Sequence, residues 1–433
     1  MQSWQTLERL LVTADDDHAV ANAGLLLTAT LADRLDAVAL ADELIDLGER
    51  RPGAAHAGEK LMTLVQSLVA GGDCIDDVDV LRAGATGAVL GHRVAAPSTV
   101  GTFLRSFTFG HVRQADAWAE KLLTRAWAAG AGPGHAPMTI DIDSTIGEVH
   151  GYAKEGASFG YTHVRGYHPL FATRADTGEV LHARFRKGSA NTGRGAQRFV
   201  REVVGRVRRA GATGPLTLRA DSGFWSMKVI AACRDHHVAY SITVRQVPAV
   251  RTAIAGINDT AWVPIDYTAG GHAEVAECPY GDKHRLVVRR TRIIGSQAEL
   301  FDNWRHHAFI TDRDGTAVEL DADHRAHAVV ELAIRDLKEG AGLAHCPSGR
   351  FSANAAWTVA ATVAHNLLRW VGRIGLGIQG ALVAKTLRRR FLTLPGRLTR
   401  SGRRQHLHLP TAWPWAEPFL DALAQLRAVV LIT

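Results

Sequence analysis

The sequence of 433 residues has few cysteines and no long apolar run. The four cysteines are widely scattered and include no Cys-x-x-Cys pair, which argues against a zinc cluster or a disulfide framework and predicts a reducing, cytoplasmic environment. The apolar stretch at residues 21–32 is short and interrupted by polar residues, so it does not predict a membrane span. The first residues lack a basic region followed by an apolar core, and no signal peptide is expected.

Acidic residues are missing from one long segment. Residues 340–416 contain no Asp or Glu, but they carry Arg350, Arg369, Arg373, Lys385, Arg388, Arg389, Arg390, Arg397, Arg400, Arg403 and Arg404. Solvated basic faces usually interleave both signs, so a segment of one sign favours a polyanionic partner. Nucleic acid is the leading candidate, since no long amphipathic helix with exposed aromatic residues accompanies the basic residues as a membrane surface would require.

The spacing of apolar residues divides the chain into a helical part and a strand-rich part. With 46% hydrophobic and 21% charged residues the composition is that of a globular protein. Three- and four-residue spacing predicts helices before residue 130, and two helices near residues 98–113 resemble a helix-turn-helix reader about as well as a simple packing domain. After a flexible glycine-rich linker at residues 130–134, three strands, a helix, a strand, a helix and a strand are expected. That order is typical of a ribonuclease-H-like α/β fold.

We therefore expect five regions. They are a helical, DNA-binding region at 1–130, the first part of a ribonuclease-H-like catalytic core at 131–245, a β insertion at 246–321, the second part of the core at 322–375 and a basic C-terminal region at 376–433. The last region includes an apolar helix near residues 417–429 that packs on the body or supports a dimer.

Two aspartates end predicted strands. Residues 138–143 alternate apolar and polar side chains, which places Asp141 and Asp143 on one face of a strand. Asp221 ends the strand at residues 215–221 in the same way. Carboxyl ends of neighbouring parallel strands meet at one sheet edge, where α/β proteins bind ligands. Either aspartate alone could be a turn residue, but two such strand ends favour a site that holds a divalent cation.

A third carboxylate lies on the predicted helix at residues 324–338. Val330, Ile334 and Leu337 form its apolar stripe. Glu331 stands at the margin of the stripe, and Lys338, seven residues later, returns to nearly the same direction. His324 and His327 are expected on this side too. A Glu and Lys pair at this spacing is also common on solvated helices. Whether Glu331 belongs to a functional site therefore depends on its being near the two aspartates.

These motifs together resemble those of bacterial DDE transposases. The resemblance rests on Asp143 in Ile-Asp-Ser-Thr, Asp221 in Arg-Ala-Asp-Ser-Gly-Phe-Trp, and Glu331 with Lys338 after a β insertion. Residues 160–170, 186–192, 353–357 and 364–367 extend it over most of the chain, and the similarity is to the 1380 group of insertion sequences. It implies a catalytic and metal-binding triad of Asp143, Asp221 and Glu331 holding two Mg²⁺ ions, for which Mn²⁺ is expected to substitute.

The resemblance also implies partners and DNA contacts. The partners are the terminal inverted repeats of the element, target DNA and a second copy of the chain in a synaptic complex, with a nucleoid-associated location in the cytoplasm. Lys338 is expected near the cleaved end, where His324 and His327 replace a Tyr and an Arg of related elements. Further DNA contacts are expected from Arg186, Lys187, Ser189, Asn191 and Arg194, and Trp304 stands where related elements stack a flipped base, although it is also a natural core residue.

Two other functions remain open at the level of sequence. Asp141-Ile-Asp-Ser-Thr145 matches the nucleophile motif of haloacid-dehalogenase-like phosphatases, with Asp141 as nucleophile and Asp143 as acid/base. That function predicts a helical cap after the strand, whereas strands are expected there. A catalytically silent DNA-binding regulator descended from a transposase is the second alternative.

Overall fold

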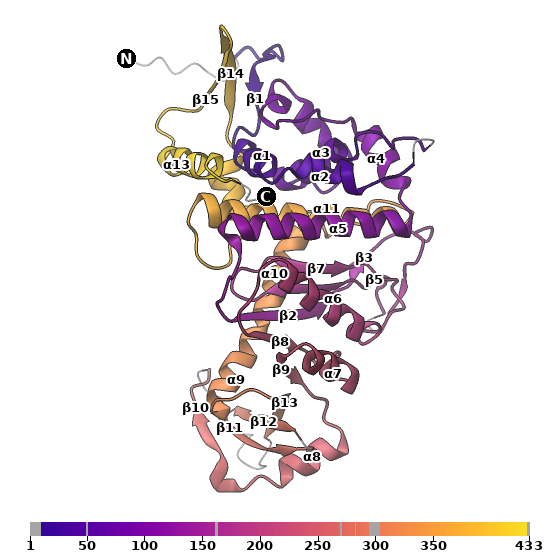
Figure 1. The fold of residues 1–433 in the computed structure, drawn as a ribbon, viewed down its shortest axis with the longest axis vertical. Helices are drawn as coiled ribbons and strands as arrows, with labels where there is room; N and C mark the ends of the chain where they lie inside the picture. The colour runs from indigo at the N-terminus through magenta and orange to yellow at the C-terminus, as the bar shows by residue number, and fades with distance from the viewer. Residues whose placement is uncertain are drawn as a thin grey trace.

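A computed structural model describes residues 10–48, 51–160, 163–268, 271–281, 283–293 and 304–430. Figure 1 shows an elongated molecule, with the N-terminal helices at one end, a mixed sheet in the middle and the strands β10 to β13 at the other end. Among the helices described, none is both long and apolar enough to cross a membrane. Residues 1–9, and Tyr161 and Thr162 of the motif at residues 160–170, lie outside the described residues.

The N-terminal part is helical and is wrapped around one buried helix from later in the chain. Its helices are α1 (Leu25–Arg34), α2 (Ala37–Leu44), α3 (Ala57–Ala70), α4 (Pro97–Arg105) and α5 (Phe109–Ala126), with 3₁₀ turns at Asp76–Arg82 and Thr86–Val89. Helix α11 (Phe351–Trp370) is buried from Ala353 onward, and it lies beside α5 and α3 (Figure 1). Because Trp118 anchors α5 in this packing, its indole donating to the Ala37 carbonyl at 2.9 Å, α5 is a packing helix along much of its length.

The central sheet follows the expected order of strands and helices. The elements are β2 (Met138–Ser144), β6 (Leu170–Arg174), β7 (Val180–Arg184), α6 (Ala196–Arg209), β8 (Leu216–Ala220), α7 (Met227–Asp235) and β9 (Val238–Thr243). Their order in the sheet is β7-β6-β2-β8-β9. Strand β6 is antiparallel to β2, whereas β8 runs parallel to both β2 and β9. The ends of β2 and β8 therefore face the same edge, as the sequence predicts.

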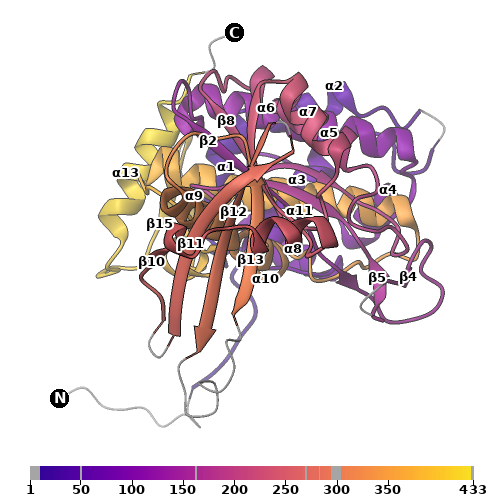
Figure 2. The same cartoon turned by 90° about the horizontal axis from the view of Figure 1, so that it is seen from below.

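The inserted strands extend the central sheet. They are β10 (Val263–Ile265), β11 (Gly271–Tyr280), β12 (His284–Ile293) and β13 (Arg305–Thr311), and helix α8 (Pro248–Ala255) precedes them. Strand β13 pairs antiparallel with β9, so that Phe309 faces Thr243 and the sheet has nine strands. Figure 2 shows β11, β12 and β13 reaching away from the body. The sequence does not predict this continuation. The backbone groups at the edge of β9 need partners, but local patterns do not show that a strand distant in the sequence supplies them.

The helix expected over residues 324–338 is two helices. Helix α9 (Ala317–Arg325) ends before a 3₁₀ turn at Ala326–Ala328, and α10 (Val329–Gly340) follows. Helix α9 contacts β11 and β12, whereas α10 contacts β2 and β6. The break redirects the chain from the inserted strands to the central ones. Val330, Ile334 and Leu337 are buried, as their spacing predicts.

The connection at residues 130–134 is hydrogen-bonded to the body through the Ala131 and Gly134 carbonyls, which corrects the expectation of a flexible linker. Helix α5 runs into a π-helical turn at Trp127–Ala131, where both end residues are buried. The Ala131 carbonyl accepts a hydrogen bond from Arg174 at 2.9 Å. A short sheet of β3 (Gly147–Glu148), β5 (Arg165–Tyr167) and β4 (Ser158–Phe159) follows the end of β2.

The C-terminal region forms a β-hairpin and a helix. Strands β14 (Gly396–Ser401) and β15 (Arg404–His408) pair with each other, and β14 also pairs with β1 (Ala19–Val20). Two short helical turns, α12 (Ala384–Leu387) and Arg388–Leu392, precede the hairpin, and α13 (Ala416–Arg427) follows it. The last helix packs on α1, whereas the strands of the hairpin are absent from our sequence-based expectation.

Candidate active site

The carboxylates of Asp143, Asp221 and Glu331 come together at one edge of the central sheet. Asp143 lies at the end of β2, and Asp221 directly follows the parallel strand β8. Burial raises the pKa of Asp143 to about 6, and the negative charges of Asp221 and Glu331 add to that rise. An electrostatic effect of this kind requires Asp221 and Glu331 to lie near Asp143, and their carboxylate oxygens are spread more widely than the 4.8 Å within which the ligand atoms of a closed metal cluster would meet. Asp221 and Glu331 are exposed, so the site opens to solvent.

Lys338 lies on the same side of α10 as Glu331. Its ammonium group donates to the Ile146 carbonyl at 3.0 Å, just beyond the end of β2. Burial lowers the pKa of Lys338, and the nearby Asp143 carboxylate opposes that effect. The spacing of seven residues therefore brings a carboxylate and a cation to the same strand end, in agreement with the helical geometry expected from the sequence.

Asp141 is fully buried and is held by an arginine and a histidine side chain. The parallel register places Asp141 opposite Arg219 on β8. The guanidinium binds both carboxylate oxygens, with N–O distances of 2.7 and 2.8 Å. His327 Nδ1 also contacts the Asp141 carboxylate, at 2.9 Å. A nucleophile for a phosphatase reaction needs an accessible carboxylate, so these contacts argue against that role for Asp141.

His327 links this buried network to the candidate triad. Its side chain is 16% exposed, and its protonated form would lower the pKa of Asp143. When Nδ1 donates to Asp141, the ring orientation is fixed and Nε2 is left as the nitrogen available to a ligand. The sequence singled out His327 by its position, but the supporting Arg219 was missed, since only the register of β2 and β8 pairs it with Asp141.

The His324 side chain lies inside the protein, and both of its ring nitrogens have partners there. Its two ring nitrogens hydrogen-bond with the hydroxyl groups of Ser241 at 2.7 Å and Thr243 at 2.9 Å, both on β9. The ring stacks on Phe309 with centroids 4.0 Å apart, and burial lowers its pKa to about 3. A histidine engaged at both nitrogens has no free donor for phosphate, so this placement does not favour the expected DNA contact. His324 lies on α9, before the break, and α9 packs on the inserted strands, whereas α10 packs on β2 and β6 beside the candidate site.

The loop at residues 187–195 lies against both aspartate strand ends. Thr192 contacts the Ser144 hydroxyl, with 3.3 Å between the oxygens, and a side chain at Gly223 would overlap Thr192. The Ser144 hydroxyl in turn bonds with His168 at 2.9 Å. Neither His168 nor Ser144 was singled out from the sequence as a support for this loop. Local patterns carry no signal for such a long-range contact.

Arg186 shapes this loop from inside. It is buried, and its guanidinium donates to the carbonyls of His168, Asn191, Thr192 and Arg194. The expected direct contact of Arg186 with DNA is therefore not favoured by its position. In contrast, the other predicted residues of the loop are exposed: Lys187, Ser189, Asn191 and Arg194.

Trp304 lines a pocket of about 480 Å³ in the inserted strands. Its ring lies next to the guanidinium groups of Arg290, 4.5 Å away, and Arg292, 4.7 Å away. Arg290 also lies 4.2 Å from the ring of Trp262 on the other side of the pocket. Trp304 is half-buried. Two tryptophans beside cations are suited to stacking on a nucleic-acid base.

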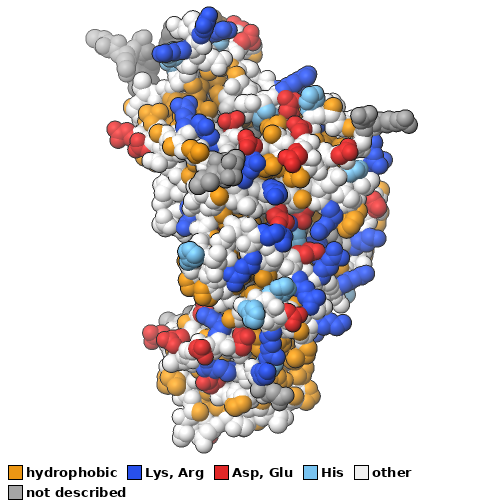
Figure 3. All heavy atoms as spheres, viewed as in Figure 1, with side chains coloured by type: hydrophobic (Ala, Val, Ile, Leu, Met, Phe, Trp, Pro, Cys, Tyr) orange, Lys and Arg blue, Asp and Glu red, His pale blue; other side chains and the backbone are white. Residues whose placement is uncertain are grey.

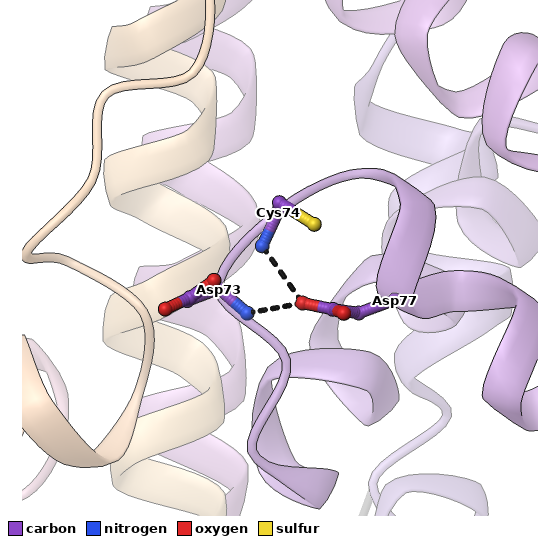
Figure 4. Close-up of side chains that lie close together, drawn as sticks. All are labelled: Asp73, Cys74 and Asp77. Atoms are coloured by element: carbon purple, nitrogen blue, oxygen red, sulfur yellow. Dashed lines mark hydrogen bonds between the residues drawn. The ribbon is translucent and has the colours of Figure 1, made fainter.

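A separate cluster of Asp73, Cys74 and Asp77 has ligand atoms within 4.8 Å of one another. Figure 4 shows that the Asp77 carboxylate accepts hydrogen bonds from the backbone amides of Asp73, at 2.8 Å, and Cys74, at 3.0 Å. These bonds tie the preceding segment to the 3₁₀ turn at Asp76–Arg82, in which Asp77 lies. Burial raises the pKa of the Cys74 thiol, which disfavours the thiolate that binds metal. We therefore interpret this cluster as a structural turn.

The sequence comparison places the chain in a family. The model described as Transposase DDE domain group 1 matches residues 4–431. The chain therefore belongs to that DDE transposase family. Among solved structures it is similar to the piggyBac transposase in a cryo-EM structure of a synaptic complex with hairpin DNA, with a TM-score of 0.47 and 12% identity over 86% of this chain and 79% of that one. None of the curated proteins compared with the chain matches it.

Proposed function

We propose that this chain is a cut-and-paste transposase that cleaves DNA at the ends of its element and joins those ends to target DNA. The observation that carries the proposal is the meeting of Asp143, Asp221 and Glu331 at one sheet edge, where the charges of the other two help to raise the pKa of Asp143. Family membership supports it. Within that family we assign the chain to the bacterial 1380 group, with a ribonuclease-H-like core at 131–245 and 322–375 and a β insertion at 246–321.

The donor set fits a site for two Mg²⁺ ions. Carboxylate oxygens are the hard ligands that Mg²⁺ prefers, and the mutual repulsion of three carboxylates is relieved by a cation. Asp143, Asp221 and Glu331 would hold the metal. The bound ions would supply activation of the attacking oxygen and stabilisation of the leaving oxygen.

Other side chains at the site would hold the DNA. Lys338, whose ammonium group lies just beyond the end of β2, would contact the phosphate next to the cleaved bond. His327, oriented by its Nδ1 contact with Asp141, would offer Nε2 to the DNA. The exposed loop residues Lys187, Ser189, Asn191 and Arg194 provide donors for the backbone of the bound strand. Figure 3 shows Lys and Arg side chains gathered over the middle of one face of the molecule, interleaved with acidic ones.

Trp304 gives the inserted strands a role in this reaction. A base rotated out of the duplex near the cleaved end would stack on its ring in the pocket that Trp262 also lines. Trp304→Ala should weaken binding of a DNA end with an unpaired base by about 1–3 kcal/mol. The same change should leave binding of fully paired duplex within twofold of wild type. An equal loss with both DNAs would contradict the stacking role.

The decisive experiment is cleavage of labelled DNA that carries the ends of the element, in Mg²⁺ and in Mn²⁺. Wild type should nick the ends, whereas Asp143→Asn, Asp221→Asn and Glu331→Gln should each abolish nicking and retain DNA binding. Two copies of the chain should be needed to bring the two ends together. Binding without any cleavage by wild type would support the silent regulator. Activity that survives Glu331→Gln would show that another carboxylate is the third ligand.

A further inference from the structure

The basic segment at residues 340–416 divides into arginines that face inward and arginines that face outward. Arg369 is buried and ion-paired with Asp336 at 3.1 Å. Arg388 donates to the carbonyls of Val69, Leu68 and Gly340. These residues hold the protein together. Since part of the positive charge is engaged in internal contacts, the charge available to a partner lies elsewhere in the segment.

The outward part includes the hairpin of β14 and β15, which lies at the end of the molecule (Figure 1). Its two strands are in register from Arg397 opposite His408 to Ser401 opposite Arg404. A two-residue turn joins them, with Gly402 at φ +60° in its first position, where a residue with a side chain would be strained. The hairpin is therefore a regular two-stranded ribbon with a tight tip.

The two faces of this ribbon differ. Leu398 and Leu407 are cross-strand partners that pack against the core at its base. Side chains alternate between faces along a strand, so the opposite face carries Arg397, Thr399, Ser401, Arg404, His406 and His408. Each of these side chains is a hydrogen-bond donor, and none is acidic. The leucine pair thus fixes the ribbon so that its donor face is turned outward.

The arginines near the tip have no internal partner for their charge. Arg403 lies in the turn, Arg404 on the donor face and Arg400 on the leucine side of the ribbon, nearer the tip than Leu398. All three are exposed, and within the described part of the chain no carboxylate lies within ion-pair distance of them. The Arg400 guanidinium donates to the Gly402 carbonyl at 3.1 Å. At the base, Arg397 lies 3.9 Å from Asp16. Figure 3 shows basic side chains at this end of the molecule, with acidic ones on the neighbouring segment.

We propose that the hairpin at residues 396–408 is an arm that lies in a groove of duplex DNA. The major groove admits a two-stranded β-ribbon, and unpaired guanidinium groups with hydroxyl groups beside them suit a row of phosphates. This inference rests on the proposed function for the biological identity of the DNA, which is either the element end or the target. The interaction itself requires only duplex DNA and no metal-dependent chemistry.

The test is binding of the full chain to labelled duplex over a range of salt concentrations in EDTA. The variant Arg400→Gln/Arg403→Gln/Arg404→Gln should bind more weakly, and the slope of log K against log salt should fall by about 0.9 for each phosphate that is no longer neutralised, or about 2.7 for three. The matched control removes three exposed arginines outside the hairpin, with Arg34→Gln/Arg82→Gln/Arg427→Gln. It should leave the slope close to that of wild type.

Each outcome decides the inference. Unfolding midpoints equal to wild type show that both triple variants are folded. A smaller slope with end DNA alone assigns the arm to the element end, and a smaller slope with end and unrelated duplex alike assigns it to any DNA backbone. Equal slopes for the hairpin variant and wild type would overturn the proposal. If the arm binds DNA but the protein never cleaves ends, the proposed function fails while this inference stands.

Discussion

Replacing Asp143 with asparagine should stabilise the metal-free protein above pH 6. The pKa of Asp143 in the folded chain is about 6, compared with an ordinary value of 3.8. Below pH 3.8 the carboxyl is protonated in both states, so no penalty exists. As the pH rises from 3.8 to 6, the folded state binds more protons than the unfolded one, and stability falls. Above pH 6 the full penalty is present.

The size of this effect follows from the shift of about two pH units. Each unit corresponds to about 1.4 kcal/mol, which gives an upper bound of about 3 kcal/mol. Asparagine has nearly the same shape and no charge, so Asp143→Asn should recover part of this free energy in EDTA at pH 8. Urea unfolding followed by tryptophan fluorescence measures it. The gain should grow as the pH rises from 3.8 to 6 and then stay constant.

A control and a metal titration complete this test. Asp33→Asn, which changes an exposed aspartate on α1, should leave the unfolding midpoint within error at every pH. Mg²⁺ should stabilise wild type more than Asp143→Asn, because the cation relieves the repulsion that the substitution has already reduced. A variant less stable than wild type in EDTA at pH 8 would refute the idea that the carboxylate cluster is electrostatically unfavourable.

Three further changes test the scaffold around the site, with urea unfolding as the measurement unless stated. Arg219→Met should cost about 3–5 kcal/mol, because it leaves the buried Asp141 carboxylate without its main partner; a loss below 1 kcal/mol would contradict this. Gly188→Ala should abolish end cleavage, since an added methyl would overlap backbone atoms of a neighbouring strand, whereas Gly160→Ala has room for a methyl at ordinary contact distance and should be mild. Arg388→Ala should lose about 1.5–3 kcal/mol by leaving carbonyls unpaired, and a neutral result would show that water replaces the guanidinium.

Local patterns were sufficient to predict much of the central sheet. Alternation of apolar residues located β2 and β8, and the spacing of three and four residues located α6 and the buried stripe of α10. These elements are encoded by neighbouring side chains, so a sequence reveals them. The convergence of Asp143, Asp221 and Glu331 also followed from their positions at strand ends and on one helical face. What that convergence does to DNA stays a prediction until cleavage is measured.

Tertiary structure decided which charged residues face inward and which face outward. Arg186, Arg388 and His324 have the same local features as exposed DNA-contacting residues, but long-range partners bind them internally. The pairing of β13 with β9 and of β14 with β15 likewise depends on strands that meet only after folding. From the sequence alone it was possible to predict the elements of the central sheet and the candidate metal-binding carboxylates at its edge. Only the folded chain determined burial, because burial depends on contacts between residues far apart in the sequence.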